Sequence, residues 1–287
     1  MNEVSIFHEY GTLEKINPPE SKIEPFHKEL EGGFYEYGIA ILKILYKYRI
    51  LNKRNLEKCL NTKKGSRWKL NMLPKMLRML RKANLIDALG IKKDNLDNYH
   101  VILYRITETG SKQIGKEYDK GLFETPDKDL LKRASLNQWH IGILRNYKEI
   151  VKEARYYSFY IPNGLPVPSM ITIKSKNKGS VKGQISVFTY PAPRSKNEIQ
   201  PFFKEILKLH SVLLQERRYR PAAIVVLCEN EAHASWTAWH TNKYRQTRPF
   251  YILYSQDLIT NTESALENLL SCDLNEEGII HASVDLT

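Results

Sequence analysis

The stretch LYRITETG, residues 103–110, indicates a β-strand that leads directly into a helix. Its residues Leu103, Tyr104 and Ile106 have the apolar and aromatic character of a strand. Thr107 has the side-chain oxygen with which an N-cap residue accepts a hydrogen bond from the first free amides of a helix. The segments that precede this turn decide which fold contains it.

Three helices and a hairpin are predicted before the turn. Apolar spacing predicts helices over residues 37–49 and 52–60 and a third helix from Asn71 onward. Asn52 and Asn71 are the expected N-caps, because asparagine is a favoured residue at that position. Two strands, about residues 85–91 and 99–106, follow and are joined by a polar tip. The expected order is therefore helix, short helix, helix, hairpin and closing helix.

Positive charge is concentrated in this part of the chain. The whole sequence has a net charge of +12, and residues 34–112 alone contain 18 basic and six acidic side chains. Residues 1–33 have three basic and seven acidic side chains. Such a local excess is typical of a protein that binds a polyanion, although a solvated helical surface can also be basic for solubility alone. Nucleic acid is the favoured partner.

Two short motifs in this segment resemble those of winged helix-turn-helix proteins. The strand ending resembles the pattern Y-x-[IL]-T-x-x-G, and LRMLRKANLID, residues 77–87, resembles the usual end of a recognition helix. Asn84 occupies a position where glycine is usual. The resemblance implies a DNA-binding domain over residues 34–116, in which the third helix enters the major groove of double-stranded DNA.

The third helix and its flanks contain the side chains that such a groove requires. Arginine can form two hydrogen bonds with guanine, and asparagine can do the same with adenine. Lysines in the preceding turn and at the hairpin tip are suited to phosphates. Any one of these residues alone is equally typical of a solvated surface, and the hypothesis depends on the set. The expected DNA-binding residues are Lys63, Lys64, Ser66, Arg67, Lys69, Asn71, Lys75, Arg78, Lys82, Lys92 and Lys93.

The rest of the chain divides into three further segments. Residues 1–33 are predicted to be an acidic, flexible or loosely docked arm, and residues 117–132 a linker. Residues 133–287 are predicted to be an α/β domain in the order helix, three strands, helix, strand, helix, strand. This order resembles the restriction-endonuclease-like fold. The expected fold class is therefore α+β or α/β, with a winged helix-turn-helix followed by an α/β endonuclease-like domain.

The combined layout is similar to the replication-relaxation family of plasmid and mobile-element proteins. His140 and Asn146 match the family pattern H-x-x-x-x-x-N, and RPAAIVVLC, residues 220–228, resembles a later core strand. The resemblance implies a sequence-specific DNA-binding protein that acts in transcription regulation or in plasmid replication or maintenance. The alternative role is an accessory factor in replication initiation or conjugative transfer, which would bind a protein of that machinery. A homodimer is expected, since two half-sites would explain sequence specificity. The apolar surface of the long helix over residues 196–218 favours burial in its own core, with a contact to the second copy as the alternative.

The acids that a nuclease of this fold needs are absent from the expected strands. No Asp or Glu occurs between Glu153 and Glu198, and Ser169 follows Pro168 where Asp is expected. Holding a divalent cation requires such carboxylates. We therefore expect no enzyme activity, no catalytic residue, no metal and no cofactor, with a metal-dependent endonuclease as the alternative. A glycine-flanked basic loop is a possible second DNA contact, through Lys174, Lys176, Lys178 and Lys182.

The remaining signals are weaker. The three cysteines are widely spaced, which favours a reducing compartment, and the longest apolar run, residues 222–228, is too short to cross a membrane. A cytoplasmic location without membrane contact is expected. Cys228, His233 and His240 are interpreted as structural, beside an apolar helical face formed by Ala232, Trp236 and Trp239. A winged helix that binds only proteins is the last alternative.

Overall fold

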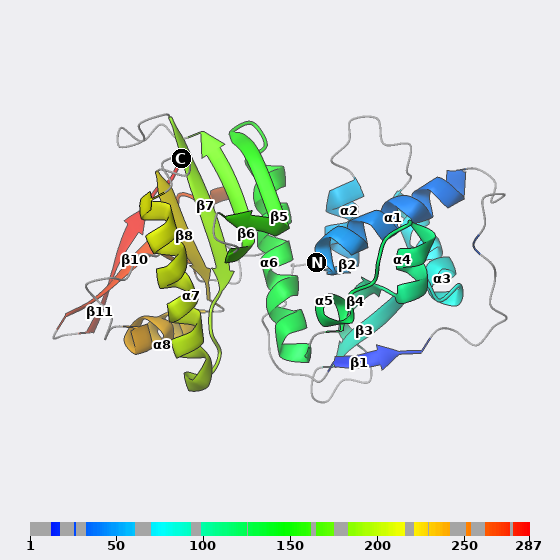
Figure 1. Cartoon of the computed structure of the whole chain (residues 1–287), viewed down its shortest axis with the longest axis horizontal. Coiled ribbons are helices and arrows are strands. Elements are labelled where there is room, and N and C mark those ends of the chain that lie inside the picture. The colour runs from blue at the N-terminus through cyan, green and yellow to red at the C-terminus, as the bar shows by residue number, and fades with distance from the viewer. Residues whose placement is uncertain are drawn as a thin grey trace. The chain divides into compact units, whose positions relative to one another are not determined.

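The chain forms two compact units, one comprising residues 9–137 and the other containing residues 138–287. We call them the N-terminal and the C-terminal unit, and each is described by itself. Both are visible in the computed structural model (Figure 1). The structure describes residues 13–17, 26, 33–60, 70–92, 99–124, 126–161, 165–174, 183–215, 221–228, 230–241, 251–253, 262–275 and 278–287.

The N-terminal unit contains the predicted helices and hairpin in the predicted order, with an additional strand, β2, between the first two helices. The 3₁₀ turn Leu70–Met72 precedes α3 directly. Secondary structure is therefore confirmed for the three helices, the hairpin and the closing helix. The elements are α1 (Phe34–Tyr48), β2 (Ile50–Asn52), α2 (Lys53–Leu60), α3 (Leu73–Lys82), β3 (Ile86–Lys92), β4 (Tyr99–Ile106) and α4 (Glu108–Gln113).

One of the two predicted asparagine caps is correct. The side chain of Asn52 accepts a hydrogen bond from the amide of Asn55 at 2.8 Å, as an N-cap does. The prediction for Asn71 is wrong, because Met72 is the N-cap of α3 and provides no side-chain hydrogen bond. Asn71 lies within the preceding 3₁₀ turn and is exposed. Its amide group is therefore directed to solvent and not to the start of the helix.

The motif LYRITETG fastens α4 to the end of α3. Thr107 Oγ1 accepts a hydrogen bond from the amide of Gly110 at 3.1 Å and donates one to the carbonyl of Asn84 at 2.7 Å. A Cβ atom at Gly110 would lie 2.1 Å from the carbonyl oxygen of Leu85, so only glycine fits there. Asn84 has φ 54, the left-handed conformation that asparagine tolerates better than most residues. This explains how asparagine replaces the usual glycine.

The acidic arm provides a strand to the sheet of this unit. The four-stranded sheet has the order β1-β3-β4-β2, and β1 (Leu13–Ile16) pairs antiparallel with β3. Residues 13–16 are therefore not a loosely docked extension, contrary to the prediction. Phe26 is a second anchor, since its ring stacks on that of Tyr35 with centroids 5.1 Å apart. Contacts between residues far apart in sequence hold the arm, and no local pattern reveals them.

The segment predicted as a linker contains helical structure. It forms α5 (Lys120–Phe123) and the first turns of α6 (Asp127–Asn146). Phe123 is buried, and the Arg49 guanidinium lies over its ring at 4.5 Å. Asn137 donates a hydrogen bond to the carbonyl of Tyr48 at 3.0 Å. The first half of α6 therefore belongs to the N-terminal unit, and the chain divides after Asn137 and not at residue 132.

The C-terminal unit is built on a mixed seven-stranded sheet. Its order is β11-β10-β9-β8-β7-β6-β5, with β7, β8 and β9 parallel and the other neighbours antiparallel. From α6 to β9, the helices and strands follow the predicted order. The last two strands were not predicted. The elements are β5 (Val151–Ile161), β6 (Leu165–Lys174), β7 (Gln184–Pro191), α7 (Lys196–Gln215), β8 (Ala222–Leu227), α8 (Glu231–Thr241), β9 (Tyr251–Leu253), β10 (Leu269–Asn275) and β11 (Gly278–Val284).

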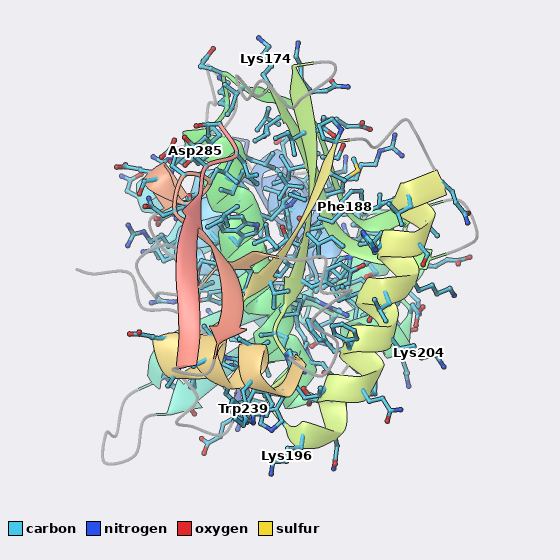
Figure 2. The ribbon with its side chains drawn as sticks, turned by 90° about the vertical axis from the view of Figure 1, so that its left-hand side faces the viewer. Lys174, Phe188, Lys196, Lys204, Trp239 and Asp285 are labelled. Atoms are coloured by element: carbon cyan, nitrogen blue, oxygen red, sulfur yellow. The ribbon has the colours of Figure 1, made fainter. Side chains whose placement is uncertain are left out.

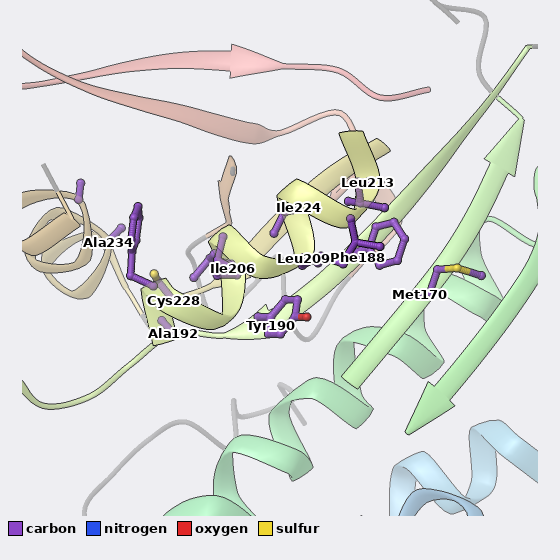
Figure 3. Packing of buried hydrophobic residues seen from close by; sticks show 14 residues of the cluster. Met170, Phe188, Tyr190, Ala192, Ile206, Leu209, Leu213, Ile224, Cys228 and Ala234 are labelled. Carbon is purple, nitrogen blue, oxygen red and sulfur yellow. The ribbon is translucent and has the colours of Figure 1, made fainter. Parts of the chain in front are cut away.

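The sheet of this unit is covered on both faces. α7 and α8 pack on one face, and Figure 3 shows Ile206 and Leu209 of α7 beside Phe188 and Tyr190 of β7. The second half of α6 packs on the other face, where Trp139 donates a hydrogen bond to Thr189. A mixed α/β architecture is thus confirmed. No helix in the described part of the chain is both long and apolar enough to cross a membrane.

Candidate nucleic-acid interface

Helix α3 has one apolar and one basic face. Its buried residues are Leu73, Met76, Leu77 and Leu80. An α-helix advances 100° per residue, so Lys75 and Arg78 lie on the opposite side of α3, and Asn71 precedes them in the 3₁₀ turn. All three residues, Asn71, Lys75 and Arg78, are exposed. The predicted basic face is therefore solvent-facing, whereas Lys82, at the end of the row, is half-buried.

The exposed side chains of this face are available for binding. Among the described residues, neither Asn71 nor Arg78 has a hydrogen-bond or ion-pair partner within the chain. Lys75 Nζ lies 5.1 Å from the centroid of the Phe34 ring, a cation–π contact that limits where the ammonium group can reach. A guanidinium and an amide on one helix face match the hydrogen-bonding edges of bases in a major groove.

Arg81 was not predicted as a functional residue, and it has a distinct role. Its Nη2 atom donates hydrogen bonds to the carbonyls of Ile16 at 3.1 Å and Asn17 at 2.7 Å. Arg81 lies on the flank of α3, between the basic and the buried face. It therefore ties the arm strand β1 to the candidate reading helix. Sequence alone offered no signal for this contact, because the partners are separated by more than 60 residues.

Three strands meet around Asp87 beside α3. Its carboxylate pairs with Lys15 of β1 at 2.9 Å and with Arg105 of β4 at 3.3 Å. The Asp87 side chain is only 12% exposed and that of Arg105 17%, so the pair is shielded from water. Arg105 also donates a hydrogen bond to the carbonyl of Phe123 at 3.4 Å. This network holds β1, β3, β4 and α5 together behind the basic face.

Several predicted contacts cannot be placed beside the basic face. Lys92 is the last residue of β3, at the end that leads to the hairpin tip. The hairpin tip and the turn before α3 are not among the described residues, so the DNA contacts predicted in these two segments stay predictions. The residues that lie outside the described part of the chain are Lys63, Lys64, Ser66, Arg67, Lys69 and Lys93, and in the possible second contact Lys176, Lys178 and Lys182.

Lys174, the described member of the second contact, has acidic neighbours. It lines a cavity of about 520 Å³ together with Glu149 and Glu267, above Tyr147 and Ile150. Figure 2 shows Lys174 at the opposite end of the C-terminal unit from Lys196. A phosphate approaching Lys174 would also meet the two carboxylates, whose charge opposes that of the ammonium group. This surface is less suited to DNA than the face of α3.

Buried polar side chains of β6 and β7 form hydrogen bonds with residues of α6. Ser169 of β6 lies opposite Thr189 of β7. His140 Nδ1 lies 2.7 Å from Ser169 Oγ, and Trp139 Nε1 donates to Thr189 Oγ1 at 3.0 Å. All four side chains are at most 1% exposed. Within the described residues, no group of three His, Cys, Asp or Glu side chains is placed to hold a metal ion.

The histidines near Cys228 have structural partners. His233 Nε2 lies 2.8 Å from the carbonyl of Pro193, and His240 Nδ1 lies 3.0 Å from that of Trp236. The predicted apolar face of α8 is wrong, however. Trp239 is 67% exposed, because Ala234 and Ala238 form the side that packs on the core. Small residues thus occupy the buried face of α8, and hydrophobicity alone pointed to the wrong side.

Comparisons with protein-family models, curated proteins and solved structures give no match to this chain.

Proposed function

We propose that the chain is a sequence-specific double-stranded DNA-binding protein in which α3 reads the major groove. The observation that carries the proposal is the exposed row Asn71, Lys75 and Arg78 on the side of α3 opposite its buried residues. A groove-reading helix needs such a face, since one side must pack on its own domain while the other reaches base edges. Residues 34–112, which contain α3, also have the entire net positive charge of the chain.

The architecture around α3 supports a winged helix-turn-helix. The order α1, β2, α2, α3, β3, β4 and α4 is the order of elements in that fold, and β2 pairs with β4 as the third strand of the wing sheet. The hairpin of β3 and β4 would then be the wing. Lys92, at its outer end, would approach a phosphate.

For the C-terminal unit we propose a binding or assembly role and no catalysis. The order α6, β5, β6, β7, α7 and β8 resembles the restriction-endonuclease-like core, in which one strand lies parallel to the last strand of an antiparallel meander. In that resemblance Ser169 and Thr189 would be at the acid positions, and both are bonded to residues of α6. Their participation in packing supports a structural or binding role for this unit. The resemblance to replication-relaxation proteins suggests a role in regulation or maintenance of a plasmid or mobile element.

A homodimer is part of the proposal, because two copies of α3 would read two half-sites and so increase specificity. The apolar residues of α7 mostly face the core of their own unit, so a dimer contact would lie elsewhere. Trp239 of α8 is the most exposed large apolar side chain among the described residues. Light scattering of the wild type and of Trp239→Ala measures whether two copies associate through it.

A salt series tests DNA binding. Affinity for random-sequence duplex DNA should fall as salt rises, with the logarithm of the association constant decreasing by about 0.9 per phosphate contact for each tenfold increase in salt. The variant with Asn71, Lys75 and Arg78 all replaced by alanine should lose both affinity and part of the slope. Lys112→Ala is the matched control, since this exposed lysine pairs with Glu108 on α4. Equal affinity of the triple variant and wild type would reject α3 as the reading helix.

Selection from a random duplex pool, followed by footprinting, then tests sequence specificity. The wild type should protect one defined sequence. Protection without sequence preference would show that the protein binds DNA non-specifically. Absence of any binding at low salt would favour a winged helix that contacts only proteins.

A further inference from the structure

The arm strand β1 covers the outer edge of the proposed wing. It pairs with β3 from Leu13 opposite Ile91 to Ile16 opposite Ala88. Because the pairing is antiparallel, Leu13 lies at the end of β3 that leads to the hairpin tip, and Ile16 lies at the opposite end. The strand therefore runs along most of the edge of β3.

Each element that we propose to approach DNA also holds this strand. From α3, Arg81 donates hydrogen bonds to the carbonyls of Ile16 and Asn17. From β4, the hydroxyl of Tyr99 donates to Glu14 Oε2 at 3.3 Å. From β3, Asp87 pairs with Lys15 at 2.9 Å. The arm and the proposed DNA site thus share their supporting residues.

The charge of the arm is opposite to that of the unit it docks on. Residues 1–33 have seven acidic and three basic side chains, and residues 34–112 have a net charge of +12. Glu14 lies opposite Gly90 in the proposed wing. A DNA phosphate near the wing would be repelled by this carboxylate, and it would attract the Arg81 guanidinium that now holds the arm. The described part of the arm and a DNA phosphate would therefore compete for the Arg81 guanidinium.

We propose that the N-terminal arm is an internal competitor of DNA, docked through β1 in the free protein and displaced from the edge of β3 when a duplex binds. This inference rests on the proposed function of α3.

Strand β1 is short, and its ion pair is exposed on the Lys15 side. The strand has only four residues, and Lys15, which makes its ion pair, is 58% exposed. Surface ion pairs of this kind contribute little to stability. Phe26 is a separate anchor, since a Cβ atom at Gly38 would lie 2.3 Å from the Phe26 ring, which shows how closely the ring packs on α1. A displaced β1 would therefore stay tethered to the unit.

Removal of residues 1–17 tests the competition directly. Binding to random-sequence duplex DNA should become about fivefold tighter or more, which is the lower end of typical coupling free energies between two binding sites. The melting temperature of the truncated protein checks that the unit is still folded. If the truncated protein is folded and binds DNA equally well or more weakly, the proposal that the arm competes with DNA is wrong. If neither protein binds any duplex at low salt, the proposed function itself fails, so the two failures are distinguishable.

Lys15→Ala tests the direction of the change in DNA affinity. Removing a cation normally weakens DNA binding, but here it loosens the arm and should strengthen binding about twofold, in keeping with the small contribution of an exposed pair. The control is Lys43→Ala, which removes an exposed lysine from α1 and should leave binding equal or slightly weaker. Weaker binding by Lys15→Ala than by Lys43→Ala would overturn the proposal and make Lys15 a phosphate contact.

Hydrogen exchange tests the proposal on the wild-type chain. It therefore remains decisive even if the truncated protein does not fold. Addition of duplex DNA should increase the exchange rate of amides in residues 13–16, while those of α1 stay protected. Slower exchange in residues 13–16 on DNA addition would show that DNA and arm bind together, which contradicts competition.

Discussion

Two sets of polar side chains, one in each unit, differ in their exposure to solvent. In the N-terminal unit, Asn71, Lys75 and Arg78 are exposed on α3, where they can exchange water for a ligand. In the C-terminal unit, His140 and Ser169 are buried and bonded to each other. A buried polar group has already replaced water by a partner within the chain, and it is costly to remove that partner. Under the proposed function, the first set therefore binds and the second set packs.

Trp139→Ala is expected to have the largest effect on stability and almost none on DNA affinity. Trp139 is fully buried between α6 and the sheet, so its removal leaves a large cavity and costs about 3–5 kcal/mol of unfolding free energy. Denaturant unfolding followed by circular dichroism measures the loss. The affinity for duplex DNA, measured with the folded variant, should match the wild type.

Trp139→Phe separates packing from hydrogen bonding at the same position. It keeps most of the ring volume but removes the Nε1–H that donates to Thr189, at a cost of about 1–2 kcal/mol. A loss of DNA affinity in either folded variant would break the comparison, because it would couple the buried cluster to binding.

Arg78→Lys tests the exposed set for base recognition. Lysine keeps the charge but loses the planar guanidinium that can form two hydrogen bonds with guanine. Affinity for the selected site should therefore fall by about 1–3 kcal/mol, while affinity for random-sequence duplex and thermal stability stay unchanged. Competition binding with the two DNA probes measures the difference. An equal loss on both probes would make Arg78 a phosphate contact.

Sequence reasoning succeeded where a signal is local. The cap at Thr107, the cap at Asn52 and the exposed face of α3 each depend on residues within two turns of a helix. Periodicity identified the face around Arg78 because one side of α3 is uniformly apolar. On α8 it failed, since Ala234 and Ala238 pack inward while Trp239 is exposed.

Contacts between distant residues were beyond the reach of such reasoning. Pairing of β1 with β3 joins residues about 75 positions apart, and the carbonyl partners of Arg81 are similarly remote. β10 and β11 lacked a recognisable strand pattern, although they form the edge of the large sheet. The hydrogen bond between His140 and Ser169 was also not predicted, because it depends on packing of a helix across two strands.

Tyr147→Phe tests how a buried polar group of the C-terminal unit makes stability depend on pH. Burial, with Glu267 and Asp285 nearby, raises the pKa of Tyr147 to about 12, although the amide of Leu266 that bonds its hydroxyl acts in the opposite direction. The ordinary value in an unfolded chain is about 10. The folded state therefore binds this proton more tightly, and its contribution to stability is complete below about pH 10 and lost as pH rises to about 12.

The variant should be less stable near neutral pH by about 1 kcal/mol, since the amide of Leu266 loses its acceptor. Its unfolding free energy should then fall less steeply than that of the wild type between about pH 10 and about pH 12. Urea unfolding across this range gives both curves. Parallel curves would show that Tyr147 titrates as in the unfolded chain.

Lys174→Ala is expected to have the smallest effect, and it tests whether the C-terminal unit also touches DNA. Lys174 is exposed like Arg78, but Glu149 and Glu267 line the same cavity, so a phosphate that entered the cavity would also meet negative charge. Affinity for duplex DNA should change by no more than about twofold, or about 0.4 kcal/mol. Glu149→Gln is the matched variant, and removal of that carboxylate should not increase affinity if no phosphate approaches. A loss with Lys174→Ala as large as that with Arg78→Ala, together with a gain with Glu149→Gln, would establish a second contact. Exposure would then decide DNA binding in both units, even where glutamates line the same cavity as the cation.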